Sequence, residues 1–259
     1  MEIAPVKTAP VGEQDPTAED WRAEAARLEP LPAERVIAWA AERFGDGLVL
    51  STSLQAGGLV ILDLAHRLGI PLRVLTLDTG RLPEETHEHV ERVRRHYGVD
   101  VEMVSPDASE VERMVRRAGP NLFRRSVEER RECCRVRKVE PLRRALAPFP
   151  AWLSGLRRNQ SAARAGTPKV QVDLALDPAG RRLKINPLAN WDEARLWAYV
   201  RDHGVPYHPL YDQGYLSIGC LPCTRPVRPA EEPRAARWWW EEDGPRECGL
   251  HILPTGGAQ

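Results

Sequence analysis

Residues 48–68 read LVLSTSLQAGGLVILDLAHRL, and the order of elements in this stretch indicates the architecture of the chain. The apolar run from Leu48 to Ser51 predicts a short buried strand. Hydroxyl, amide and glycine residues up to Gly58 predict a loop, and the apolar spacing over 59–68 predicts a helix. A buried strand followed by a short loop and a helix is the repeating unit of parallel α/β sheets.

The same alternation continues along the chain. Further buried strands are predicted at 73–78, 99–104 and 152–156. Helices are predicted at 18–28, 32–44, 83–97, 109–117, 128–146 and 192–202. Segments 170–175 and 182–185 predict an edge hairpin. We therefore expect an α/β fold with a doubly wound parallel sheet.

Composition and the two ends of the chain suggest one domain with tails. Residues 1–17 lack a hydrophobic signal core and are expected to be a flexible leader. Residues 18–228 are expected to form one α/β domain. Proline and glycine become frequent after residue 204, so 229–259 are expected to be a tail laid over the open edge of the sheet.

Charge and hydropathy exclude some classes of partner. The chain has 37 basic and 37 acidic residues, so net charge offers no bulk attraction to nucleic acid or to a membrane surface. No apolar run is long enough to cross a bilayer. Without a secretory signal, the thiols are expected in a reducing, cytoplasmic compartment, where paired cysteines indicate metal or redox chemistry.

Polar loops follow three of the predicted strands. They are Ser51 to Gly58, Leu77 to Arg81, and Ser154 to Arg164. The carboxyl ends of parallel strands meet at one edge of the sheet, where ligands of open α/β sheets bind. Each loop alone is also compatible with a plain turn or a solvated basic segment. Together they predict a site for an anionic nucleotide, with arginines suited to phosphate or sulfate.

Four of the five cysteines form two pairs. Cys133 and Cys134 are adjacent, and Cys220 and Cys223 form a C-x-x-C. Four thiolates can complete one tetrahedral metal site or one [4Fe–4S] cluster, and C-x-x-C alone is compatible with a zinc half-site or a redox pair. Successive side chains on a helix diverge by about 100°. A compact zinc site therefore accepts an adjacent pair with difficulty, whereas a bulkier cluster accepts it more easily.

The fifth cysteine, Cys248, has a different setting. It lies between Arg246 and His251, in the sequence Arg-Glu-Cys-Gly-Leu-His. Cationic neighbours lower the pKa of a thiol and raise its thiolate fraction near neutral pH. Cys248 is thus either a nucleophile or an incidental exposed thiol. The three tryptophans at 238–240 argue against a disordered tail, because large aromatic side chains need a surface to pack against.

Taken together, these residues resemble the assimilatory adenylyl-sulfate reductase family, the iron–sulfur branch of the phosphoadenylyl-sulfate reductases. The most specific matches are the adjacent cysteines followed by Lys138, the C-x-x-C, and the terminal Glu-Cys-Gly-Leu-His. The resemblance spans residues 48–251. One departure is Arg246, where a lysine commonly precedes Glu-Cys; the charge is kept.

The resemblance implies an adenine-nucleotide α-hydrolase-like fold and the two-electron reduction of adenylyl sulfate to sulfite and AMP. It implies an S-sulfocysteine intermediate on Cys248, discharged by thioredoxin or a glutaredoxin-like dithiol protein. It also implies one [4Fe–4S] cluster held by Cys133, Cys134, Cys220 and Cys223. The implied catalytic residues are Cys248, His251, Lys138, Arg234 and Arg237. The implied substrate-binding residues are Ser51, Ser53, Asp78, Thr79, Gly80, Gly155, Arg157 and Arg164.

Three alternatives are open at this level. The chain could act on the 3′-phosphorylated nucleotide, phosphoadenylyl sulfate, or on both nucleotides. An adenylating or tRNA-thiolating enzyme with structural zinc should carry an S-G-G-x-D-S loop, which the segment around Gln55 lacks. An iron–sulfur redox sensor would explain four cysteines but not Cys248 or the arginine loops. The sequence leaves self-association into a homo-oligomer open.

Overall fold

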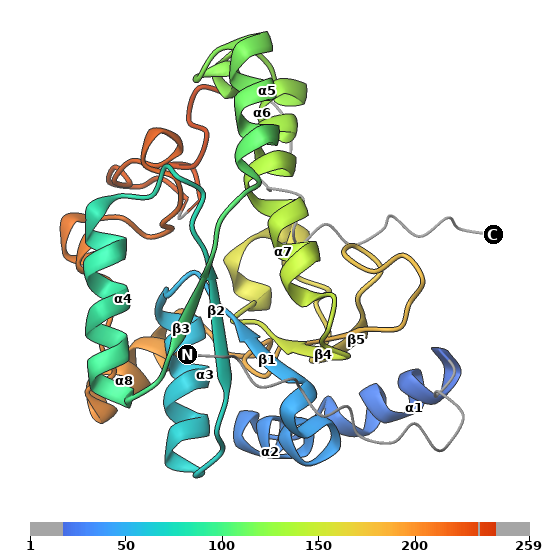
Figure 1. The fold of residues 1–259 in the computed structure, drawn as a ribbon. Coiled ribbons are helices and arrows are strands. Elements are labelled where there is room, and N and C mark those ends of the chain that lie inside the picture. The colour runs from blue at the N-terminus through green and yellow to red at the C-terminus, as the bar shows by residue number, and fades with distance from the viewer. Residues whose placement is uncertain (1–17, 233, 242–259) are drawn as a thin grey trace.

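The computed structural model describes residues 18–232 and 234–241, and it has one six-stranded sheet (Figure 1). The strands are β1 Leu48–Ser51, β2 Arg73–Leu77, β3 Val101–Val104, β4 Ala151–Leu153, β5 Val170–Val172 and β6 Leu183–Ile185. Their order is β3-β2-β1-β4-β6-β5, and every pairing is parallel except that of β5 with β6. The predicted parallel sheet and its edge hairpin are confirmed.

The strand order creates a crevice between β1 and β4. From β1 the chain builds outward to β2 and β3, and then crosses to β4 on the other side of β1. The loops that follow β1 and β4 therefore lead to opposite sides and leave an opening at the carboxyl end of the sheet. Such a switch point is where open α/β sheets bind ligands.

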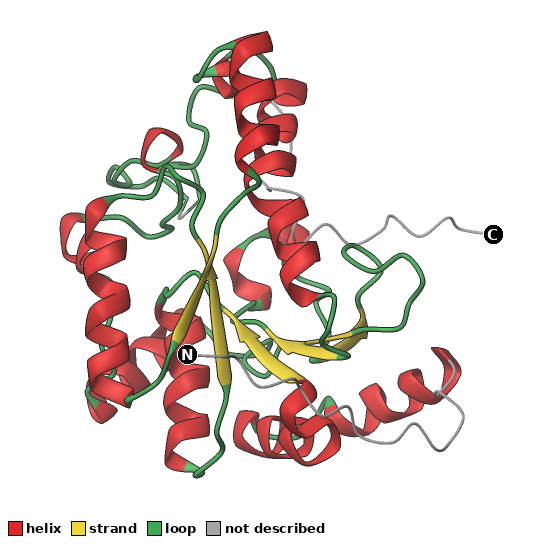
Figure 2. Ribbon diagram, viewed as in Figure 1, coloured by secondary structure: helices red, strands yellow, loops and turns green. Residues whose placement is uncertain are grey.

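Helices cover both faces of the sheet (Figures 1 and 2). They are α1 Ala18–Leu28, α2 Ala33–Phe44, α3 Ala56–Arg67, α4 Glu84–Tyr97, α5 Ala108–Ala118, α6 Val127–Cys134, α7 Glu140–Leu146 and α8 Glu193–His203. Side chains of α2, α3, α4 and α8 form the larger apolar core on one face. Leucines of α7 close a smaller core on the other face. None of the helices in the described ranges has the length and apolar character needed to cross a membrane.

The alternation of side chains along β1 joins the two cores. Leu48 and Leu50 belong to the larger core, whereas Val49 between them belongs to the smaller one. All three are at most 2% exposed. A strand buried on both faces needs a continuous apolar run rather than an alternating one, which is the pattern that residues 48–50 have.

A third apolar cluster lies away from the sheet, around α5 and α6, which extend beyond its carboxyl edge in Figure 1. Its members include Met114, Phe123 and Trp238, together with the four paired cysteines. Helix α6 begins at an N-cap serine, Ser126, whose hydroxyl accepts a hydrogen bond from the Glu129 N–H at 3.2 Å. Cys133 and Cys134 thus lie at the far end of a capped helix, and all four paired cysteines lie outside the main core.

The predicted single helix over 128–146 is wrong in one respect. Between α6 and α7, residues Arg135–Val139 form a π-helical turn. A π turn accommodates one extra residue relative to α spacing, and such turns are frequent at functional sites. Here the turn follows directly after Cys134 and contains Lys138. Apolar periodicity did not indicate it, because the segment has only two apolar residues, Val136 and Val139, among three cations.

Other element bounds differ by a few residues. Strand β4 ends at Leu153, before the predicted 156, because Ser154 begins the loop at the crevice. Helix α3 begins at Ala56, so it includes Gly57 and Gly58, which were expected in the loop. Glycine disfavours helix in isolation, and tertiary contact at these two positions overrides that preference.

Two buried histidines predict an acid-sensitive fold. His89 of α4 and His208 are each 0% exposed, and their rings lie 5.3 Å apart. Burial lowers the pKa of each ring to about 4; His208 adds to the effect on His89, and Arg92 acts on both, whereas Glu85 opposes the shift at His208. In the unfolded chain both bind protons near pH 6.5, so stability falls as pH falls from 6.5 towards 4.

Between pH 7 and pH 5, each histidine is expected to lower the free energy of unfolding by about 2 kcal/mol. Denaturant titrations at the two pH values measure it. In His89→Leu the loss between pH 7 and pH 5 should be smaller by roughly that amount. The same change at His96, exposed on the same helix, should retain the full loss. An unchanged pH dependence in His89→Leu would contradict the assignment.

Candidate functional site: a cavity at the switch point

A cavity of about 410 Å³ occupies the crevice beyond β1, β2 and β4. Its wall includes the loops after these strands and a crossing segment at residues 216–219. Among the sequence-predicted site residues, those that line it are Ser51, Ser53, Thr79, Lys138, Gly155, Arg157, Arg164, Arg234 and Arg237. The three polar loops predicted to share one edge of the sheet therefore contribute to one cavity.

The loop after β1 has a constrained backbone. Leu54 is fully buried and adopts a left-handed conformation with φ of 55°, which is rare for a residue with a side chain. Its N–H donates to the Thr52 hydroxyl at 2.9 Å. A Cβ on Gly58 would lie 1.9 Å from the same hydroxyl oxygen. The glycine thus leaves room for Thr52, and Thr52 holds the turn.

Helix α3 approaches the loop after β4 backbone to backbone. A Cβ added to Gly155 would lie 2.6 Å from the Gly58 nitrogen and 2.8 Å from the Gly57 carbonyl carbon. A Cβ on Gly57 would lie 2.8 Å from the Gly155 oxygen. Only glycine fits at these positions, and the contact sets the distance between the two sides of the crevice.

Thr79 and Leu82 of the loop after β2 line the cavity, whereas the residues on either side of Thr79 do not. Asp78 and Gly80 are not among the lining residues; the Asp78 carboxylate instead accepts the Gly80 N–H at 2.8 Å. The Thr79 carbonyl accepts from Nη1 of Arg137 at 2.6 Å, and its hydroxyl lies 3.2 Å from the Cys220 sulfur. This loop therefore touches both cysteine-bearing segments.

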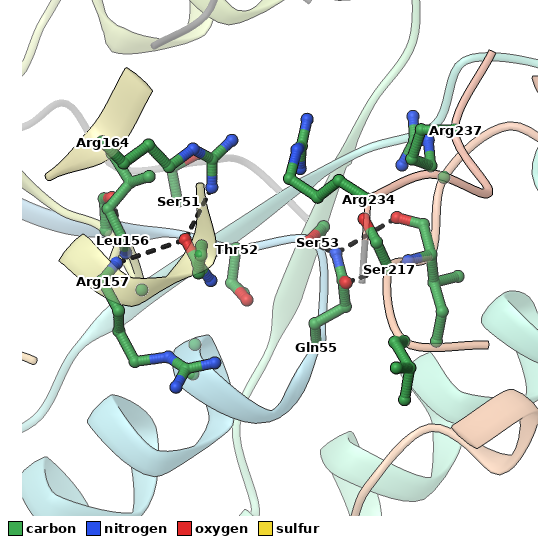
Figure 3. Close-up of a pocket in the computed structure, with 18 of the residues that line it drawn as sticks. Ser51, Thr52, Ser53, Gln55, Leu156, Arg157, Arg164, Ser217, Arg234 and Arg237 are labelled. Atoms are coloured by element: carbon green, nitrogen blue, oxygen red, sulfur yellow. Dashed lines mark hydrogen bonds between the residues drawn. The ribbon is translucent and has the colours of Figure 1, made fainter. Parts of the chain in front are cut away.

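The arginines that follow β4 point in different directions. Arg157 donates to Glu193 at 2.5 Å and points to the side of the cavity opposite Arg164 (Figure 3). Arg164 is held by the amide oxygen of Gln160 at 2.6 Å. Arg158 leaves the cavity and pairs with Glu29, at the end of the N-terminal helix α1. Arg157 and Arg164 thus point to opposite sides of the cavity, and Arg158 anchors the loop.

Four cations line the cavity besides Arg157. Arg164, Arg234 and Arg237 lie in a row along the upper side in Figure 3, across from the Arg157 guanidinium, and Lys138 of the π turn also lines the cavity. A row of arginines along one side of a polar cavity suits an anion with several oxygens. The remaining wall, with its loops and apolar side chains, can hold the uncharged part of the ligand.

Arg237 is held in a stack. A Cβ on Gly219 would lie 2.4 to 2.6 Å from three atoms of the Arg237 guanidinium, so the guanidinium lies directly against this glycine. Its central carbon lies 4.8 Å from the Trp238 ring, and Arg130 covers the same ring at 4.4 Å. Arg130 pairs with the buried Glu241 at 2.6 Å. These contacts leave Arg237 little freedom.

The four paired thiols lie in one buried cluster. Each is 6 to 7% exposed, and all four are free cysteines. Burial raises the pKa of the Cys133 thiol, and burial followed by the charge of Cys220 raises that of Cys223 to about 11. At Cys220, burial is outweighed by Lys138, Thr79 and Arg237, so its pKa falls. Lys138 therefore contacts both the thiol cluster and the cavity.

The four paired cysteines have the chemistry of a cluster donor set. A [4Fe–4S] cluster needs four thiolates spread around a larger core, in a mainly apolar surround. The four cysteines, packed with Met114, Phe123 and Trp238, provide that donor set, and Lys138, Arg137 and Arg237 provide compensating charge.

Several site residues lie outside the described ranges or were not anticipated. Cys248 and His251 lie outside the described residues. The roles of Asp78 and Gly80 in substrate binding stay predictions. No sequence pattern indicated the Gly219–Arg237 stack, or the role of Gln55, whose side chain bridges two walls of the cavity. Gln55 belongs to the polar loop after β1, but its partner lies 163 residues away.

Comparison with known proteins gives one consistent family. The phosphoadenosine phosphosulfate reductase domain matches residues 47–226. An adenosine 5'-phosphosulfate reductase of Allochromatium vinosum is 50% identical over 80% of this chain and 79% of that protein. The reductase of that name from Burkholderia cepacia is 45% identical over 88% of each chain.

Among solved structures, phosphoadenylyl-sulfate reductase from Candida auris, crystallised as a phosphate complex, superimposes with a TM-score of 0.68 at 30% identity. The match covers 83% of this chain and all of that one. The predicted adenine-nucleotide α-hydrolase-like fold is confirmed by this similarity. Fold, cavity and sequence thus agree, and the chain belongs to the phosphoadenosine phosphosulfate reductase family, within its adenosine 5'-phosphosulfate reductase branch.

Proposed function

We propose that the chain reduces adenylyl sulfate to sulfite and AMP in assimilatory sulfate reduction. The observation that carries the proposal is the polarity of the cavity. Arg164, Arg234, Arg237 and Lys138 line it, together with apolar side chains and with hydroxyl and glycine loops at the carboxyl ends of β1, β2 and β4. A nucleotide with a phosphosulfate tail has the complementary distribution of charge. The names of the bacterial relatives support the same substrate.

The first step is nucleophilic displacement at sulfur. The Cys248 thiolate attacks the sulfur of the sulfate group, an S–S bond forms, and the S–O bond to phosphate breaks. AMP leaves with the bonding electron pair, and Cys248 carries the sulfo group as S-sulfocysteine. Lys138, Arg164, Arg234 and Arg237 stabilise the negative charge that builds up on the phosphate oxygens. His251 lies three residues beyond the nucleophile and is suited to the same anion.

The second step consumes two electrons from a dithiol protein such as thioredoxin. One of its thiolates attacks the Cys248 sulfur, and sulfite departs with the electrons of the S–S bond. The second thiol of the dithiol then resolves the mixed disulfide. Cys248 returns as a thiol, and the partner leaves as a disulfide.

The presence of free thiols elsewhere in the chain is in keeping with a cytoplasmic location.

Cys133, Cys134, Cys220 and Cys223 would hold one [4Fe–4S] cluster. When bound, it supplies a compact charged group that fixes the two cysteine segments relative to each other. The protein side of this arrangement is Lys138, whose ammonium lies between Cys220 and the cavity. The electrons of the reaction come from the dithiol, so none of them pass through the four cysteines or Lys138.

Intact mass after incubation with adenylyl sulfate, without reductant, tests the proposal. We expect a gain of one sulfo group per chain, mapped to Cys248 by peptide analysis and removed by reduced thioredoxin. The 3′-phosphorylated nucleotide is run in parallel, and we expect a slower reaction with it. No adduct from either nucleotide on cluster-loaded protein would overturn the proposal. A strong preference for the 3′-phosphorylated nucleotide would reassign the substrate.

A further inference from the structure

The side chain of Gln55 links two walls of the cavity. Gln55 precedes the first turn of α3, yet its side chain does not cap the helix. Its Nε2 donates to the Ser53 hydroxyl at 2.7 Å and to the Ile218 carbonyl at 3.1 Å. Its Oε1 accepts the Ile218 N–H at 3.0 Å. Figure 3 shows Gln55 between Ser53 and the segment that carries Ser217.

This amide pairs with the backbone of Ile218 as a neighbouring strand would. Ile218 is 5% exposed and lies in irregular chain, between the 3-10 turns Pro209–Gln213 and Leu221–Cys223. Buried backbone groups in such a segment need partners. Both donors and the acceptor of the Gln55 amide are engaged, so the side chain is fixed on the loop side as well.

The position of Ile218 determines where the next two residues lie. Gly219 comes directly after it, and the Arg237 guanidinium lies directly against this glycine. Cys220 is next along the chain. A shift of Ile218 by a few tenths of an ångström would therefore move the surface that supports Arg237. The loop after β1 cannot absorb such a shift easily, because Leu54 is buried with a positive φ and is tied to Thr52.

We propose that Gln55 is a positioning residue, which holds residues 218 and 219 against the loop after β1 and thereby places Arg237 for the sulfate end of the substrate. The proposal rests on the proposed function, because that function gives Arg237 its anionic ligand. Gln55 itself touches Ser53 and Ile218, and its effect on the anion is exerted through Gly219 and Arg237.

Gln55→Met tests the inference, because methionine keeps the length of the side chain and loses all three hydrogen bonds. The first measurement is hydrogen exchange on the cluster-loaded protein. We expect faster exchange in the peptide containing the Ile218 amide, with β1 unchanged. Gln213→Met, the same substitution at an exposed position of the nearby turn, is the matched control and should exchange as wild type.

The second measurement is binding of adenylyl sulfate and of AMP, in a Cys248→Ser background so that the ligand is not consumed. We expect Gln55→Met to lower the affinity for adenylyl sulfate about tenfold, which is the scale of one charge-assisted hydrogen bond. The affinity for AMP should fall by less than about twofold. An equal loss for both ligands, or none for either, would overturn the inference, as would unchanged exchange at Ile218.

Two further results separate failure of the inference from other failures. If Gln55→Met does not fold, Gln55→Ala removes the same three hydrogen bonds without a long side chain to place; faster exchange at Ile218 is again expected, and its absence overturns the inference. The Cys248→Ser protein with Gln55 intact is the reference for the binding measurement. If this reference does not bind adenylyl sulfate, the proposed function fails, and so does the proposed effect of Gln55 on the position of Arg237 for the sulfate group. The exchange measurement still decides whether Gln55 holds Ile218.

Discussion

In the Cys248→Ser variant we expect sulfite release to fall by at least about 10³-fold, the scale seen when a nucleophile is removed. A serine hydroxyl retains its proton near neutral pH and is a far weaker nucleophile than a cysteine thiolate. No other cysteine can take over readily. The remaining four are each at most 7% exposed, and they belong to the buried cluster beside α6.

The measurement is single-turnover sulfite release with excess thioredoxin. Visible absorbance of the cluster and affinity for AMP serve as controls, and both should match wild type, because the proposed cluster ligands are the other four cysteines. Retained turnover would remove Cys248 from its proposed role. Loss of the cluster absorbance in this variant would mean that Cys248 is a ligand and that the division of the five thiols is wrong.

Gly155→Ala should disrupt the cavity through the backbone alone. The added Cβ would lie 2.6 Å from the Gly58 nitrogen, and a helix backbone cannot rotate aside as a side chain can. The first turn of α3 must therefore move away from β4. We expect a loss of about 3 kcal/mol of stability, at the upper end of overpacking effects. AMP binding should fall at least about tenfold, because the crevice between β1 and β4 changes width.

Gly166→Ala is the matched control for this substitution. Gly166 lies on the exposed part of the same loop region, and a Cβ there meets nothing within 4 Å. Its stability should stay within about 0.5 kcal/mol of wild type. Denaturant titration and calorimetric AMP binding on both variants make the comparison. Equal behaviour of the two alanine variants would contradict the backbone contact.

The sheet could be predicted because its signals are local. Apolar runs such as 48–50 and 74–75 are buried on both faces, so their continuous hydrophobicity indicates a parallel strand without knowledge of the neighbours. Parallel topology then places the loops after β1, β2 and β4 at one edge. The shared location of Ser53, Thr79 and Gly155 follows from that rule and from no property of the residues themselves.

The rest of the site depends on contacts between distant segments. Arg157, Arg158 and Arg164 look equivalent in sequence, but Glu193, Glu29 and Gln160 direct them to three different places. The side chain of Gln55 could not be assigned because its partner is a backbone, which carries no sequence signal. The π turn was missed for a different reason: a charged segment has no apolar periodicity from which a change in helical spacing could be detected.

The π turn at Arg135–Val139 sets the rotation between the two halves of this helical segment. Upstream of it the helix presents two thiols to the cluster region, and downstream Leu142 and Leu146 pack on the sheet. If the same residues wound as a regular α-helix, one half would be rotated against the other by about 100°. Cysteines and leucines could not then both face their present surroundings. The turn thus holds the one residue by which the segment exceeds α spacing, and a single-codon deletion within it would leave both sets of side chains on their present sides, whereas an added codon would turn one set away.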